Sequence, residues 1–271
     1  IPGISGGTVA LITGIYSELV TSLASFGATS VRLVFSPRDF FAHHNMNFLV
    51  TLFLGMLCGA LMFSQLFKFL FVHYAPIVWG FLFGLVLGSV FVIGLKRKFG
   101  NLLKFGGAGL LLGFSLTYFP TASTEVNHVA LFFVGMLAVC AWILPGISGS
   151  FVLLAFGYYQ TILEAVSDFD WNILLVLIFG LISGLLAFSK LLRWLILRHE
   201  DRLLSLLTGF MMGSLARLWP WQAKMTGQSF ELLSPQVFSD LTGETAFVAS
   251  TILASFFGLF SLWLIGRIDS H

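Results

Sequence analysis

The most constraining feature of this sequence is a glycine- and proline-rich motif that occurs twice in a largely apolar chain. One copy, Pro-Gly-Ile-Ser-Gly-Gly-Thr, occupies residues 2–8, and the other, Leu-Pro-Gly-Ile-Ser-Gly-Ser, occupies residues 144–150. When residue 1 is aligned with residue 144, nine of the first 23 positions are identical, including Gly14 with Gly157 and Tyr16 with Tyr159. We interpret this similarity as an internal duplication.

The duplication continues beyond the motif at a different spacing. Identical residues recur 125 positions apart, at Gly55/Gly180, Gly59/Gly184, Phe63/Phe188, Ser64/Ser189, Gly84/Gly209, Gly88/Gly213 and Ser89/Ser214. The change in spacing from 143 to 125 residues indicates a longer loop after the first motif than after the second. The sequence therefore predicts two repeats, residues 1–126 and 127–271.

Each motif predicts a helix that breaks and then starts again. Proline lacks a backbone donor and glycine permits positive φ, while a serine or threonine hydroxyl can cap the new helix. A new helix N-terminus has unpaired N–H groups that attract anions. A tight turn between closely packed helices is the better explanation of one copy alone. Two copies at matching places favour a transporter binding site, which paired interrupted segments typically form.

The composition identifies an integral membrane protein. The chain is 58% hydrophobic and only 10% charged, whereas soluble domains carry about 25% charged residues. It has no basic stripe of the kind that binds nucleic acid. Cys58 and Cys140 lie in apolar runs and predict neither a disulfide nor a metal site. The neighbouring His43 and His44 lack other nearby ligands, so we expect a solvated loop over residues 31–47, no metal and no cofactor.

Apolar runs predict an all-α polytopic membrane protein. In each half we expect a re-entrant helical hairpin and three spans, which cover residues 48–72, 76–95, 102–119, 171–197, 203–219 and 246–265. The second hairpin covers residues 129–166; residues 9–26 form the return arm of the first, whose other arm we expect ahead of residue 1. Because three spans per half is an odd number, the halves form an inverted repeat and the motifs meet near the midplane.

Charge predicts the orientation and several site residues. If residues 96–98 (Lys-Arg-Lys) are cytoplasmic, most of the 14 lysines and arginines share that side, as the positive-inside tendency requires. Arg217 is then one of few outer cations and a candidate to attract an anion, although an interfacial anchor explains it equally well. Glu18 and Glu164, on the two hairpin return arms, are candidate proton carriers for coupling, although a solvated position near a helix end is the simpler explanation.

Both motifs, together with Gly-Ser-Leu at residues 213–215 and Leu-Trp-Pro at 218–220, resemble the bacterial polyprenyl-phosphate transporter family. The resemblance covers essentially the whole chain. It implies a flippase that returns undecaprenyl phosphate from the outer to the inner leaflet of the bacterial cytoplasmic membrane. This lipid carrier then serves again in the synthesis of peptidoglycan and other cell-envelope polymers. The second copy departs from the first, with Ser150 and Phe151 in place of Gly7 and Thr8, so the halves need not bind the lipid equally.

An anionic headgroup on an apolar tail requires a polar site at membrane depth with an apolar route beside it. We therefore expect the motifs to bind the phosphate through backbone N–H groups and hydroxyls. The candidate residues are Gly3, Ser5, Gly6, Gly7, Thr8, Gly146, Ser148, Gly149, Ser150 and Arg217. A proton or sodium gradient is the expected energy source, and the oligomeric state stays open, with a homo-oligomer allowed.

Two other functions stay open from the sequence. A small-anion transporter could share this architecture, and flux of a small solute would favour it. An intramembrane lipid-processing enzyme is disfavoured, because no histidine, aspartate and serine cluster lies within a predicted span. We therefore predict a transporter and not an enzyme.

Overall fold

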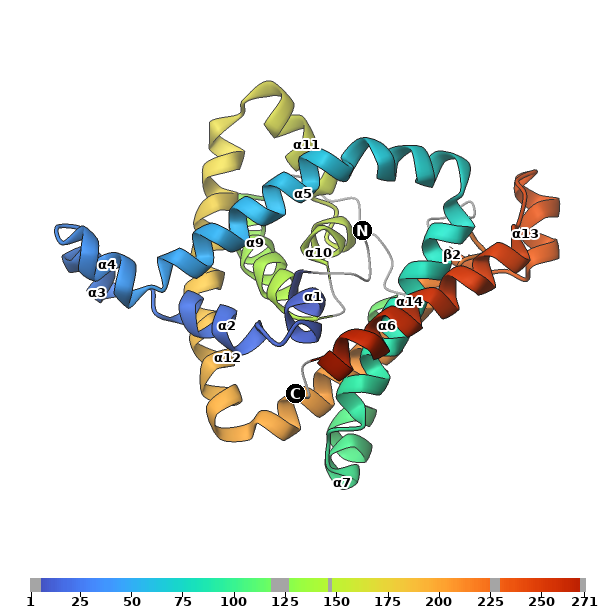
Figure 1. Ribbon diagram of the computed structural model, residues 1–271. Helices are drawn as coiled ribbons and strands as arrows, with labels where there is room; N and C mark the ends of the chain where they lie inside the picture. Colours follow the sequence, from blue (N-terminus) through green and yellow to red (C-terminus); the bar gives the residue numbers. More distant parts are fainter. Residues whose placement is uncertain (1–5, 118–126, 146–147, 225–229, 269–271) are drawn as a thin grey trace.

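The computed structural model describes residues 6–117, 127–145, 148–224 and 230–268, and is mostly helical (Figure 1). The motif residues Gly3, Ser5 and Gly146 lie outside these ranges, so their predicted roles stay predictions. A short antiparallel strand pair, β1 (Gln222–Lys224) with β2 (Phe230–Leu232), interrupts the helical fold. The expectation of an all-α chain is thus correct only in its main part.

The predicted spans coincide with long apolar helices. They are α5 (Met46–His73), α6 (Ala75–Gly94), α7 (Phe99–Asn101) with the π-helical η1 (Leu102–Gly106) and α8 (Gly107–Thr117), α12 (Trp171–Ser214) with the 3-10 turn η2 (Leu215–Leu218), and α14 (Val248–Ile268). The predicted first arm of the second hairpin is α9 (His128–Ile143). In the part of the chain that the structure describes, Ala75–Gly94 and Trp171–Leu218 are each long and apolar enough to cross a membrane. Several apolar helices of this kind are those of a multi-pass membrane protein.

Helix α12 joins two predicted spans through a kink. His199 has non-helical angles, φ −139° and ψ 36°, and Figure 1 shows the helix turning sharply between its two parts. The 48 residues of Trp171–Leu218 would extend about 70 Å if straight, against about 30 Å for a bilayer core. The kink therefore allows one continuous segment to supply two crossings.

Both predicted hairpin return arms are broken into two helices. The first consists of α1 (Gly6–Ile12) and α2 (Tyr16–Ala24), and the second of α10 (Gly149–Ala155) and α11 (Tyr159–Asp168). The breaks fall at Gly14 and Gly157, whose φ values are +74° and +80°, and α10 and α11 are bent by 107°. Glycine adopts this left-handed conformation without a Cβ penalty, so the duplicated glycine sets the duplicated break.

Replacing Gly157 with alanine is expected to destabilise the break between α10 and α11. A residue with a Cβ in this left-handed conformation costs about 1–2 kcal/mol, and asparagine costs less because it tolerates it. Thermal unfolding of the purified protein in detergent should therefore place Gly157→Ala below Gly157→Asn, and both below wild type. Equal midpoints for the three proteins would contradict this explanation of the break.

Glycines let the long helices touch at their backbones. A Cβ at Gly84 of α6 would overlap the Ser255 carbonyl of α14, and one at Gly209 of α12 would overlap Gly106 of η1. The repeat-related pairs behave differently elsewhere. Gly180 and Gly184 pack against the α9 backbone, whereas a Cβ at Gly55 or Gly59 of α5 would meet no described atom within 4 Å. Glycine thus permits close backbone approach at α6 and α12, and among the described residues Gly55 and Gly59 of α5 make no such approach.

Two segments that lie between predicted spans contain ordered elements. Residues 31–47 include parts of α3 (Ala28–Leu33) and α4 (Pro37–His43), and His44 is fully buried rather than solvated. Its ring stacks on Phe26 at 4.2 Å, and its Nδ1 lies 2.7 Å from the Ser25 hydroxyl. The loop before α14 contains β1, β2 and α13 (Pro235–Thr242). Aromatic packing orders residues 31–47, and the mixed composition of this segment did not predict that packing.

Candidate functional site

The second motif links α9 to α10 through an interrupted backbone. Helix α9 ends at Ile143, Pro145 is buried, and Ser148 is the extended residue that precedes α10. Ser148 was expected to cap α10, but its side chain makes no capping hydrogen bond. Its Oγ instead lies 2.7 Å from the Oγ of Ser150. The paired hydroxyls form a small polar surface at the start of α10, with Ser150 exposed and Ser148 half-buried.

The first motif lies directly against the second. A Cβ at Gly7 would overlap the carbonyl of Ile143 and approach Leu144, so α1 packs on the chain just where α9 breaks. Gly149 serves a similar purpose within the second hairpin, since its Cβ would lie 2.6 Å from the Ala138 carbonyl oxygen. The structure thus brings the described parts of the two copies together. Close packing also explains why glycine is needed at positions 7 and 149.

The other first-motif candidates differ in accessibility. Gly6 is exposed, and a Cβ there would meet nothing within 4 Å among the described atoms. Thr8 is buried, with only 1% of its surface accessible, so it faces the protein interior. Helices α1 and α10 have seven residues each, about two turns, so their dipoles are shorter than those of typical anion-binding helices. Hydroxyls and cations must therefore contribute more to any anion binding than the helix N-termini do.

Arg217 lies beside the second motif. It belongs to η2, after the second part of α12, and its guanidinium carbon is 5.6 Å from the centre of the Phe151 ring in α10. That distance is within the range of a cation–π contact. The structure therefore brings together Arg217 and the helix that follows Ser148, two predictions made from sequence positions about 70 residues apart.

An apolar cavity of about 200 Å³ opens beside the first motif. Every described residue that lines it is apolar: Gly6, Gly7, Val9, Ala10, Ile15, Leu19, Leu23, Leu52, Met56, Trp142 and Ile143. Trp142 directly precedes the end of α9, and half of its surface is exposed. The first motif copy therefore borders an apolar cavity, and the second copy contributes the hydroxyls of Ser148 and Ser150.

The two candidate proton carriers lie on exposed surfaces. Glu18 of α2 accepts a hydrogen bond from the Asn45 side chain at 2.8 Å, and Glu164 of α11 is exposed. Neither lines the apolar cavity, and neither lines a second cavity that contains Lys96 and Arg97. Their role in coupling stays a prediction. Within the described ranges, no group of three histidine, cysteine or acidic side chains is arranged to hold a metal ion.

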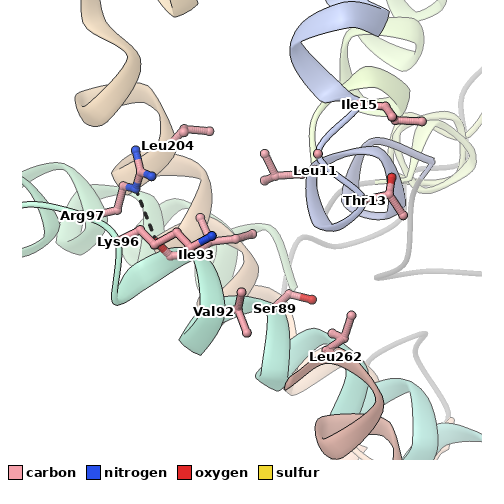
Figure 2. Close-up of a pocket in the computed structure, with 11 residues that line it drawn as sticks. Leu11, Thr13, Ile15, Ser89, Val92, Ile93, Lys96, Arg97, Leu204 and Leu262 are labelled. Carbon is pink, nitrogen blue, oxygen red and sulfur yellow. Dashed lines mark hydrogen bonds between the residues drawn. The ribbon is translucent and has the colours of Figure 1, made fainter. Parts of the chain in front are cut away.

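A second cavity, of about 460 Å³, was not anticipated as a site. We call it the basic cavity; it is lined by Leu11, Thr13, Gly14, Ile15, Ser89, Val92, Ile93, Lys96, Arg97, Leu204 and Leu262. Figure 2 shows Leu11, Thr13 and Ile15 on one wall and the residues from α6 on the other. In the sequence, Lys96 and Arg97 indicated only the orientation of the chain. Their meeting with the end of α1 required the tertiary structure.

Comparisons with known proteins agree with these features. Residues 1–231 match a family described as undecaprenyl phosphate translocase-like. The chain is 36% identical over 258 residues to a polyprenyl-phosphate transporter of Vibrio cholerae, with 90% of this chain and 84% of that protein covered. It is 31% identical over 241 residues to a polyprenyl-phosphate transporter of Staphylococcus aureus, with 81% of each covered. No solved structure matches the chain.

The family match covers most of the chain, and the alignment with each relative covers at least 81% of this chain. The resemblance inferred from the doubled motif is confirmed. The family and its relatives are named for transport and not for catalysis, so the chain is a transporter and not an enzyme. It is a membrane protein of the undecaprenyl phosphate translocase-like family.

Proposed function

We propose that this protein carries polyprenyl phosphate across the membrane, with the phosphate at the paired motifs and the first isoprene units in the apolar cavity. The observation that carries the proposal is the apolar cavity itself, which directly adjoins Gly6 and Gly7. A small inorganic anion has no use for such a recess, whereas a lipid phosphate must shelter an apolar chain beside its charge.

In this proposal, the second motif supplies the main groups that bind the phosphate headgroup. The hydroxyls of Ser148 and Ser150 can turn their protons toward a phosphate, and Arg217 supplies positive charge near the same helix. Hydrogen bonds to a charged group contribute about 1.5–3 kcal/mol each, more than neutral ones. Ser5 and Gly6 would play the corresponding part in the first motif if the two halves are related as an inverted repeat.

Our proposal extends to the direction of transport and its energy source, and the distribution of lysine and arginine supports the orientation. We infer movement from the outer to the inner leaflet of the bacterial cytoplasmic membrane, with the Lys/Arg-rich ends of the helices at the cytoplasmic face. A proton or sodium gradient drives the movement. Glu18 and Glu164 remain the proposed proton carriers, and replacing each by glutamine would test this role.

The experiment is leaflet-resolved transport in vesicles that contain the purified protein. A fluorescent short-chain polyprenyl phosphate is placed in one leaflet, and its arrival in the other is followed with and without proton or sodium gradients. Protein-dependent movement of the phosphate, but not of the corresponding prenol, is the expected result. Flux of inorganic phosphate without lipid movement would instead favour the small-anion transporter.

Replacing Arg217 with glutamine is expected to weaken binding of a short-chain prenyl phosphate about tenfold, because a partly buried charge beside the second motif is lost. Arg217→Lys should retain part of the affinity, since it keeps the charge. Equilibrium binding to protein in nanodiscs measures both. Arg38→Gln, on exposed α4, is the matched control and should bind as wild type. Equal loss in Arg38→Gln would point to general surface charge and remove the role of Arg217.

A further inference from the structure

We propose that the basic cavity is a second binding site for the phosphate-monoester headgroup, at the Lys/Arg-rich end of α6, with Lys96 as its principal cation. This proposal rests on the proposed function and adds a second headgroup-binding site to the transport path. The headgroup would leave the paired motifs, pass along α1 and dwell beside Lys96 before release. The site is separate from the Ser148–Ser150 hydroxyls and Arg217, which lie near the start of α10.

The charge in the cavity is positive and only partly compensated. Arg97 is held by Asp201 at 3.6 Å, and its Nε donates to the Ile93 carbonyl at 3.4 Å. The side chain of Lys96 makes no hydrogen bond or ion pair to any described residue, although its backbone N–H donates to the Ile93 carbonyl at 3.2 Å. No acidic side chain lines the cavity in the described part of the chain. Lys96 therefore supplies a full positive charge to an incoming anion, while Arg97 is oriented by its carboxylate neighbour.

The two hydroxyl groups that line the basic cavity already donate to backbone carbonyls. Thr13 donates its hydroxyl proton to the Val9 carbonyl at 2.9 Å, and Ser89 donates its own to Leu85 at 2.8 Å. Neither hydroxyl is then a donor to a phosphate in this geometry. The donors available to an anion are thus the ammonium of Lys96 and the outer N–H groups of Arg97, the groups best suited to a phosphate monoester.

The position of the cavity connects the motifs to the charged end of the bundle. Its lining on this side runs from Ser89 and Ile93 of α6 to Lys96 in the turn that follows the helix. Helix α1 starts beside the second motif at Gly6 and ends at the turn with Thr13 and Gly14 that lines the cavity. A headgroup that follows α1 from its first residue to its last therefore arrives opposite Lys96.

The basic cavity also has an apolar neighbour that suits the tail. Ile15 lines both the basic cavity and the apolar cavity beside the first motif. The two cavities are thus separated by the turn between α1 and α2, which Gly14 forms with positive φ. An amphiphile with its phosphate near Lys96 could keep its first apolar units against this turn. A volume of about 460 Å³ falls within the usual range of small-molecule sites, about 300–1,000 Å³.

The test places a reporter in the cavity itself. Val92 lines the cavity and is partly buried, so a Val92→Cys variant in a chain with Cys58 and Cys140 replaced by alanine reports access to a thiol reagent. Farnesyl phosphate is expected to slow the labelling, whereas farnesol is not. Adding Lys96→Gln should raise the farnesyl phosphate concentration needed for half protection about tenfold. Lys96→Arg should restore protection, and Lys98→Gln, an exposed residue outside the cavity lining, should leave it unchanged.

Inorganic phosphate distinguishes the two sources of the same chemistry. Protection at much lower concentrations of farnesyl phosphate than of inorganic phosphate supports a lipid headgroup site. Equal protection by both would make this a free-phosphate site and overturn the proposed lipid headgroup site. No protection, or protection unaffected by Lys96→Gln, would overturn the site altogether. Lipid movement by the cysteine variant in the same vesicles is measured separately, so failure of the proposed transport function is distinguishable from failure of the basic cavity.

Discussion

Replacing Ser148 with leucine is expected to abolish movement of polyprenyl phosphate between leaflets while leaving the fold intact. The substitution removes one of two hydroxyls that face each other at 2.7 Å and places a bulky apolar side chain at the start of α10. Loss of a hydrogen bond to a charged group alone lowers affinity at least about tenfold, and steric exclusion of the phosphate adds to that loss. The leaflet-resolved vesicle assay measures the rate.

Ser167→Leu is the matched control for this variant. Ser167 is exposed on α11 of the same hairpin, and its hydroxyl donates to the Leu163 carbonyl of its own helix. We expect wild-type transport from Ser167→Leu, and unchanged thermal unfolding from both variants. Wild-type transport by Ser148→Leu would remove the second motif from the proposed site, whereas a large fall in its unfolding midpoint would show a structural role instead.

Replacing Gly7 with alanine is expected to disrupt the contact between the two motif copies. The added Cβ would overlap the backbone carbonyl of Ile143, which cannot move aside as a flexible side chain can. Overpacking of this kind costs about 1–3 kcal/mol and displaces the backbone. We expect a lower unfolding midpoint in detergent together with loss of transport, because α1 would be pushed away from the point where α9 breaks.

Gly107→Ala controls for the general cost of changing a helical glycine in this chain. Gly107 begins α8, and a Cβ there would meet no described atom within 4 Å. Because alanine favours a helix over glycine, this variant should be as stable as wild type or slightly more so. If Gly7→Ala also matches wild type in stability and transport, close approach of the motifs is not needed for function.

The recurrence of residues along the chain already specified much of the local structure. The paired Gly14 and Gly157 share a positive φ, and helices α1 and α10 occupy matching positions at the same spacing as the motif. The placing of these breaks was nevertheless missed, because an isolated glycine in an apolar run is compatible with an unbroken helix. Only the observed backbone conformation distinguishes a break from a continuous arm.

The candidate site was predictable in its residue types and only partly in its arrangement. Ser148 and Arg217 could be named from a motif and from a rare outer cation, but nothing in their spacing predicted that Arg217 would lie over Phe151. The glycines were ambiguous in another way. Gly7 and Gly149 could equally admit a ligand or a neighbouring helix, and the backbone of another segment occupies the space in both cases.

By itself, the sequence determined that this is a membrane transporter with duplicated broken helices, since apolar length, backbone-breaking residues and motif identity are local properties of the chain. The tertiary structure decided which residues each end of α1 contacts. It brought the end of α1 to Lys96 and the start of α1 to the break after α9. These meetings depend on the packing of helices far apart in sequence, where glycine positions set how closely two backbones approach and periodicity alone does not name the partner.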